Sequence, residues 1–152
     1  MSKVAESRNR PEPVSQFSVF TENRMGRLHD LIDLFNAQNI HVLAITALDT
    51  TDAAILRIIV DDPDRGRNLL VEHNFPFTES EVLVVEIDSE SKLKGVLRAL
   101  VRAEINIHYA YSFITQPNGR PALALSLEDR EIAATSLAQH QFKVLYQADL
   151  AR

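Results

Sequence analysis

The chain contains no cysteine, which excludes disulfide bonds, thiolate metal sites and a cysteine nucleophile. It has no apolar run near the roughly 18 residues that a membrane-spanning helix needs, and its first residues lack the apolar core of a signal peptide. We therefore expect a cytoplasmic protein without a membrane partner. The net charge of −5 gives no general positive field for nucleic acid, so we expect the partner to be a small molecule or another protein.

The sequence does have enough apolar residues for a real core, at 45% of 152 residues. Residues 1–14 are polar, carry two prolines and show no periodicity, which predicts a flexible N-terminal tail. After the tail, β-branched and aromatic runs alternate with segments that repeat apolar residues at helical spacing. The expected order is strand 16–22, a helix starting after Gly26, strands 40–48 and 53–60, helix 63–73 and a short edge strand at 75–77.

The same order then begins again. It gives strand 82–88, helix 91–104, strands 105–115 and 121–128, helix 129–141 and strand 142–149. An offset of 65 residues matches Leu28 with Leu93, Leu31 with Val96, Phe35 with Leu100 and Ile40 with Ile105, and an offset of 67 matches Asp62 with Asp129 and His73 with His140. Two copies of a βαββαβ unit follow, over residues 15–79 and 80–152. The expected class is α+β: two ferredoxin-like repeats side by side, in an antiparallel sheet with helices on one face.

The face of the sheets opposite the helices is too apolar to meet water. Its expected residues are Leu43, Ile45, Ile55, Ile59, Leu83, Val85 and Ile87. An apolar face of this kind packs on a partner, so we expect a homodimer formed through the open sheet face.

The loop before the first helix, in ENRMGRLHDLIDL, is the strongest candidate for a binding site. Gly26 can adopt backbone angles closed to other residues and lets a ligand approach the peptide groups. Free amides at a helix start, with the positive end of the helix dipole behind them, attract a carboxylate or phosphate. The alternative is that Gly26 only makes a turn.

Longer segments carry a family resemblance. The chain resembles ACT domains in ENRMGRLHDLIDLFNAQNIHVLAITALDT, then in ILRIIVDDPDRGRNLLVEHNF, and in INIHYAYSF of the second copy. The resemblance covers about residues 16–148. It implies a regulatory module that binds a free amino acid at the junction of two copies, against the first loop, and signals to a separate enzyme or transporter. The family usually places a proline before the loop glycine, and Met25 stands there in this chain.

The second copy departs further from the family, because Ser91 replaces the glycine and Asp88 and Glu90 add two carboxylates. Like charge would repel a carboxylate ligand there, so we expect one dominant site per chain, in the first loop. Its expected ligand-binding residues are Asn23, Arg24, Met25, Gly26, Arg27 and Leu28, together with Tyr109 and Tyr111. The two tyrosines share the alternation of Ile105 and Ile107, which predicts the helix-covered side of the sheet, where they would line the pocket or simply belong to the core.

Other classes of function find less support. His29 and Asp33 have a ligand-compatible spacing without a third ligand close in sequence, and the serines lack a nucleophile-elbow pattern, so we expect no metal, no cofactor and no catalytic activity. RNA binding through the sheet face would need exposed aromatics and the opposite charge. The main alternative to a sensor is a ligand-independent module for protein–protein interaction or dimerisation. The sequence leaves open which amino acid binds and which protein is regulated.

Overall fold

The structure is a computed structural model and describes residues 10–22, 26–50 and 52–151. The first half contains β1 (Val14–Glu22), α2 (Arg27–Ala37), β2 (Val42–Asp49), β3 (Ala53–Val60), α3 (Pro63–Glu72) and β4 (Phe77–Glu86). The second half contains α4 (Glu90–Arg102), β5 (Ile107–Ser112), the 3₁₀ turn η1 (Pro117–Gly119), β6 (Ala122–Leu127), α5 (Arg130–Gln139), β7 (Val144–Leu145) and α6 (Gln147–Leu150). The predicted α+β class with two repeated units is confirmed. The end of the chain differs from the prediction, since β7 is two residues long and α6 replaces the rest of the expected strand 142–149.

The four long helices all end in the same way, which is a signature of the repeat. The chain turns into the left-handed region at Asn39, Asn74, Glu104 and Gln141, with φ of 57°, 58°, 58° and 68°. The next residue in each case is apolar, and its amide donates back to the helix, as from Ile40 to Phe35 O at 2.9 Å. This is the hydrogen-bond pattern of a Schellman C-cap.

The strands form one antiparallel sheet in the order β2-β3-β1-β4-β6-β5, with β7 also paired to β4. Strand β4 belongs to both units: Phe77–Val82 pair with β1, and Leu83–Glu86 pair with β6. The prediction of a short edge strand at 75–77 and a separate strand at 82–88 is therefore wrong. The residues between them, TESE, are exposed but keep their ladder with β1, so polarity does not mark a break in the strand.

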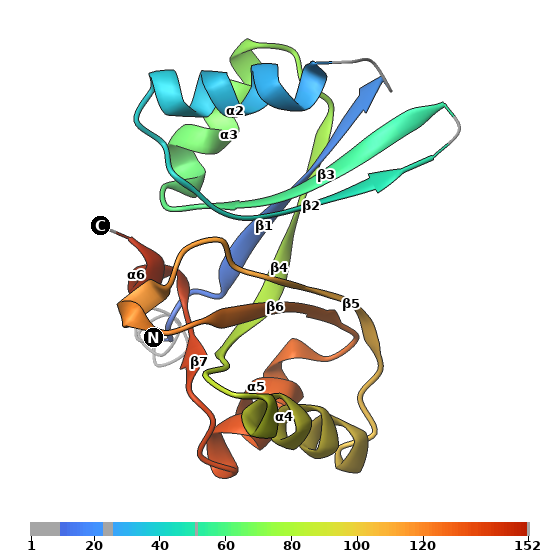
Figure 1. Cartoon of the computed structure of the whole chain (residues 1–152), viewed down its shortest axis with the longest axis vertical. Coiled ribbons are helices and arrows are strands. Elements are labelled where there is room, and N and C mark those ends of the chain that lie inside the picture. The colour runs from blue at the N-terminus through green and yellow to red at the C-terminus, as the bar shows by residue number, and fades with distance from the viewer. Residues whose placement is uncertain (1–9, 23–25, 51, 152) are drawn as a thin grey trace, which may run out of the picture.

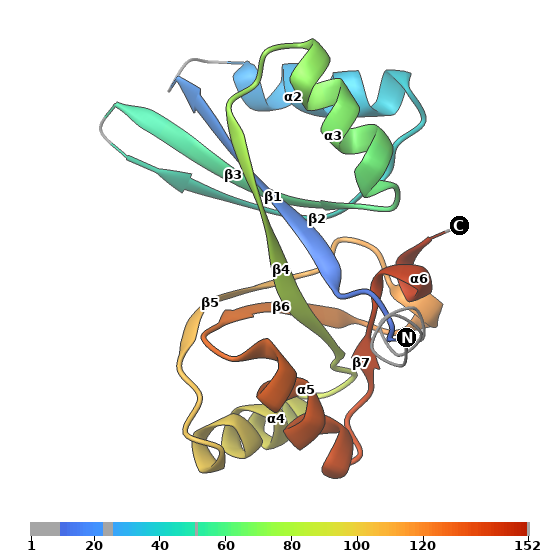
Figure 2. The same ribbon diagram turned by 180° about the vertical axis from the view of Figure 1, so that it is seen from behind.

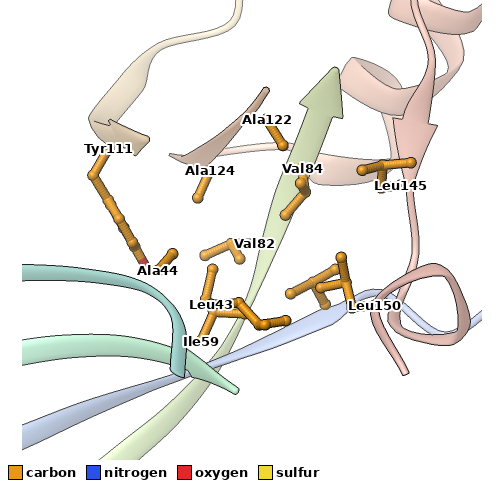
Figure 3. Packing of buried hydrophobic residues seen from close by; sticks show 11 residues of the cluster. Leu43, Ala44, Ile59, Val82, Val84, Tyr111, Ala122, Ala124, Leu145 and Leu150 are labelled. Carbon is orange, nitrogen blue, oxygen red and sulfur yellow. The ribbon is translucent and has the colours of Figure 1, made fainter. Parts of the chain in front are cut away.

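The sheet bends back until its outer strands meet. A bridge joins Ala44 in β2 to Phe113 just after β5, and the amide of Ile114 donates to Leu43 O at 2.8 Å. The open faces of the two units thus lie against each other, while α2 and α3 cover the outside of one unit and α4 and α5 the outside of the other (Figures 1 and 2). Figure 3 shows the interior that results, which we call the inter-unit core. It consists of Val14, Leu43, Ala44, Ile59, Val82, Val84, Tyr111, Ala122, Ala124, Leu145 and Leu150, with Tyr109 and Phe113 packed against it.

This arrangement corrects the expected partner of the open sheet face. Leu43 and Ile59 are indeed buried there, but the second unit of the same chain covers them, so a second copy is not what fills this face. Ile45 lies instead in the helix-side core of the first unit, since a bulge between Val42 and Ala44 shifts the alternation of β2.

Three other expected open-face residues, Leu83, Val85 and Ile87, lie in the helix-side core of the second unit. The residues of β4 that face the inter-unit core are Val82 and Val84. Both sides of this part of the strand are apolar, so its alternation does not reveal which side faces the helices.

Candidate functional site

The start of α2 holds the described part of the predicted binding loop. Asn23, Arg24 and Met25 lie outside the described residues. Gly26 is the N-cap, with φ 86° and ψ −8°, and its carbonyl accepts the first helical hydrogen bond from the Asp30 amide at 2.9 Å. Gly26 itself gives the helix no side-chain cap, so within the described residues the N-cap position offers no oxygen to the amides of the first turn.

The other three long helices start differently. Asp62 caps α3, Asp129 caps α5 and Ser89 caps α4, each through a side-chain oxygen that accepts an amide hydrogen bond. In the second loop the cap is Ser89 and not Ser91, which lies within the first turn because α4 starts earlier than the repeat offset suggests. There the Asp88 carboxylate is also paired with Lys92 at 3.0 Å, and this pairing lowers the pKa of Asp88. In the second unit a helix-start amide therefore already has an acceptor, the Ser89 hydroxyl.

Of the remaining loop residues, Arg27 borders a cleft and Leu28 does not line it. The Arg27 guanidinium lies 5.1 Å from the centre of the Phe75 ring, and Leu28 is 42% exposed. A cleft of about 410 Å³ runs beside α2, lined by Arg27, Asp30, Asp33, Leu34, Ala37, His73 and Phe75. Its acidic side chains would suit the ammonium of a ligand, while Arg27 and the uncapped helix start would suit a carboxylate.

The two predicted tyrosines lie elsewhere, and the expected side of the sheet is wrong for both. A bulge in β5 between Ile107 and Tyr109 reverses the alternation, so Ile107 packs on the helix side while Tyr109 and Tyr111 face the inter-unit core. Tyr109 and Tyr111 are stacked with ring centres 6.3 Å apart. Figure 1 places β5 in the second unit, away from the start of α2 at the outer end of the first. The structure does not bring the tyrosines to the loop.

The tyrosines instead form a polar cluster between the units. Gln16, which is fully buried in β1, donates to the Tyr109 hydroxyl at 2.7 Å and accepts from the Tyr111 hydroxyl at 2.6 Å. The Arg57 guanidinium in β3 lies 3.9 Å from the centre of the Tyr109 ring. Burial raises the pKa of the Tyr111 hydroxyl well above its usual range, so this group stays a neutral donor. Sequence reasoning missed Gln16 and Arg57, although a single arginine within the apolar run AAILRIIV was a visible signal.

A larger cleft of about 640 Å³ lies between the units near the N-terminus of α3, and sequence reasoning missed it too. It is lined by Glu12, Asn39, His41, Asp61, Asp62, Pro63, Asp64, Arg65, Gln147, Ala148 and Ala151. On one wall the His41 ring lies 2.8 Å from the Asp61 carboxylate, and the His41 amide donates to the other Asp61 oxygen at 2.9 Å. These contacts tie the ends of β2 and β3 together.

Features of two other classes of function are absent from the described residues. Within the described ranges, no helix is both long and apolar enough to cross a membrane. In the same part of the chain, no three metal-ligating side chains of the His, Cys, Asp or Glu type gather closely enough to hold an ion.

Comparison with known families decides the identity of the fold. The family model described as an ACT domain pair matches residues 13–152. The chain belongs to the ACT domain pair family. Membership supports a regulatory, ligand-binding role in general terms. No protein of curated function matches the sequence.

Solved structures support the same architecture. Protein BT0572 from Bacteroides thetaiotaomicron is 26% identical, with a TM-score of 0.83 over 93% of this ACT domain pair and 98% of that chain. The ligand-free regulatory subunit of aspartate kinase from Thermus thermophilus is 13% identical, with a TM-score of 0.60 over 85% and 91% of the two chains. The corresponding subunit from Thermus flavus is 12% identical, with a TM-score of 0.54 over 84% and 92%. At these identities, the two aspartate kinase subunits show that the fold is shared.

Proposed function

We propose that this ACT domain pair is a sensor that binds a free amino acid and signals to a separate enzyme or transporter. The proposed site is the start of α2, which lies away from the junction of the two units where the resemblance implied the ligand (Figure 1). The observation that carries the proposal is the contrast between the uncapped, left-handed Gly26 and the Ser89-capped start of α4. In this proposal one dominant site exists per chain, and the protein itself has no catalytic activity. The fold shared with regulatory subunits of aspartate kinase supports action on a separate protein.

The chemistry of an amino acid suggests how the site works. The ligand carboxylate would accept hydrogen bonds from the amides that follow Gly26, where the helix dipole also favours negative charge. Its ammonium would find acceptors in Asp30 or Asp33 on the cleft wall, or in the Asn23 side chain. Binding would tighten the loop against the first unit, and coupling of this kind between sites is typically about 1–3 kcal/mol.

The test is a thermal-shift and calorimetric screen of the wild type against the common free amino acids. A ligand present at about 100 times its Kd stabilises a protein by roughly 2.7 kcal/mol. Gly26→Ala should reduce that stabilisation sharply. Gly119→Ala is the matched control, because both glycines have positive φ and open space where a Cβ would go, so both replacements introduce similar backbone strain. If no amino acid stabilises the wild type at millimolar concentration, the sensor proposal fails.

The second candidate is an interaction module that works without a ligand. It is favoured by the apolar residues of the first unit's sheet that remain outside the inter-unit core: Phe20 is 37% exposed and Leu48 is 48% exposed. A homodimer through this outer part of the face stays a prediction. Sedimentation at micromolar concentration tests it, with a monomer as the result that removes it.

A further inference from the structure

On the side of the first unit's strands that faces away from α2 and α3, side chains from neighbouring strands form cross-strand rows. The outer row aligns Leu48, Ile55 and Phe20, because Ile55 pairs with both of the others. The next row aligns Thr46, Arg57, Ser18 and Thr78 across four strands. Residues that pair directly in an antiparallel sheet point to the same side. An arginine thus stands among three hydroxyls, with an apolar row on its outer side.

Arg57 is the unusual member of this group. Its Nε is buried and has no hydrogen-bond partner among the residues that the structure describes. Its only ring contact given by the structure is the stacking on Tyr109, which comes from the second unit. A half-buried guanidinium normally has an acceptor, since an unsatisfied charged donor is costly. The stacking holds the group in place without supplying that acceptor.

We propose that the row around Arg57 is a binding site for a small organic carboxylate with an apolar body. The carboxylate would bind the two terminal nitrogens of Arg57 in bidentate geometry, because these nitrogens also have no hydrogen bond or ion pair to a described residue, while Nε is covered by the protein. The hydroxyls of Ser18, Thr46 and Thr78 would donate from either side of the row. The apolar body would lie on the outer row, where Phe20 and Leu48 are exposed.

The site is separate from the α2 loop and does not depend on the proposed function. It faces the opposite side of the sheet from α2, because Phe17 and Val19 pack on the helix side while Ser18 lies between them. Arg57 also touches Tyr109, and Tyr109 is hydrogen-bonded to Gln16. An anion on Arg57 would therefore act directly on the contact between the two units.

The probes are 4-methylpentanoate, its amine analogue 4-methylpentylamine, and acetate, which has no apolar body. Calorimetry measures affinity, and near-UV circular dichroism reports on the site because the chain has three tyrosines and no tryptophan. We expect 4-methylpentanoate to bind at least about ten-fold more tightly than either control and to change the tyrosine signal. Arg57→Met should lose about ten-fold or more in affinity, and Arg57→Lys should retain part of it.

Three controls make the test decisive. Arg98→Met, on the exposed face of α4, should bind like the wild type, and so should Gly26→Ala, which separates this site from the loop. Equal binding by wild type and a folded Arg57→Met variant would overturn the proposal, as would no carboxylate binding by the wild type at about 20 mM. A third result would also overturn it: if the wild type is a dimer that binds no carboxylate, and Phe20→Ser is a monomer, then a second copy of the chain covers this row instead.

Discussion

Removing the Tyr111 hydroxyl should weaken the contact between the two units by a measurable amount. In Tyr111→Phe the buried Gln16 loses the donor that lies 2.6 Å from its side-chain oxygen, while its nitrogen keeps Tyr109 at 2.7 Å. Gln16 is fully buried, so its oxygen has no route to water. A buried acceptor left unsatisfied costs about 1–3 kcal/mol. For a chain of this length each kcal/mol lowers the melting temperature by roughly 2–4 °C.

A double-mutant cycle isolates the interaction. Gln16→Leu should be destabilising as well, since it leaves the Tyr111 hydroxyl without its acceptor. The double variant Gln16→Leu/Tyr111→Phe should cost less than the sum of the single variants by about 1–2 kcal/mol, because both ends of the hydrogen bond are then apolar. Urea unfolding followed by far-UV circular dichroism measures all three. Thr135→Val, which removes an exposed hydroxyl in α5, is the control and should be near neutral.

Additive costs in that cycle, within about 0.5 kcal/mol, would refute the reasoning. They would show that the Tyr111 hydroxyl and the Gln16 side chain do not rely on each other as hydrogen-bond partners. The expected non-additive result would instead establish that a hydrogen bond, and not apolar contact alone, joins β1 of the first unit to β5 of the second.

Three further predictions concern pH and packing. The pKa of Tyr111 is raised in the folded state, so its contribution to stability is complete below the unfolded pKa of about 10 and is lost as pH rises above that value. The free energy of unfolding of Tyr111→Phe should therefore fall less steeply with alkaline pH than that of the wild type. The Arg67 hydrogen bonds lower the pKa of Glu79, so the contribution of this pair to stability is present above about pH 4.3 and is lost in acid. Glu79→Gln should therefore make the loss of stability in acid less steep, by less than about 1 kcal/mol because the pair is partly exposed. A Cβ at Gly95 would lie 2.7 Å from the tip of the Phe142 ring, so overpacking in Gly95→Ala should cost about 1–3 kcal/mol, while replacing a glycine inside α4 should return about 1 kcal/mol of helix propensity. Urea unfolding should therefore show a net cost of about 0–2 kcal/mol, and a net gain would show that the ring moves freely aside.

The sequence was most informative where the deciding interactions are local. Asn39, of a residue type that often ends helices, turns left-handed just after α2. The next helix was expected to start at residue 63, and α3 does start at Pro63, capped by the Asp62 side chain. Caps and periodicity depend on residues within a turn or two of one another, which is why the repeat and the fold class could be predicted.

The sequence was least informative where distant segments meet. The closure of the sheet depends on Ala44 and Phe113, which are far apart in the chain. The bulges in β2 and β5 each add a residue opposite one partner residue, and nothing local in the sequence marked them. The predicted position of Tyr109 failed for that reason, and so did the predicted partner of the open face.

The two candidate sites also differ in whether local sequence or distant contacts reveal them. Gly26 could be recognised because a positive φ before a helix is a local requirement. The importance of Arg57 arises from its cross-strand neighbours and from Tyr109 in the other unit, so it appears only when the register is known.

The shared strand β4 makes the two repeats inseparable. The expected boundary between residues 79 and 80 falls within its ten residues, so separating the halves there would divide the ladder between β1 and β4 and open the inter-unit core to water. Neither half should survive as an independently expressed fragment. Amide protons in the middle of β4 should exchange only through global unfolding, so that slow exchange there reports the stability of the whole chain.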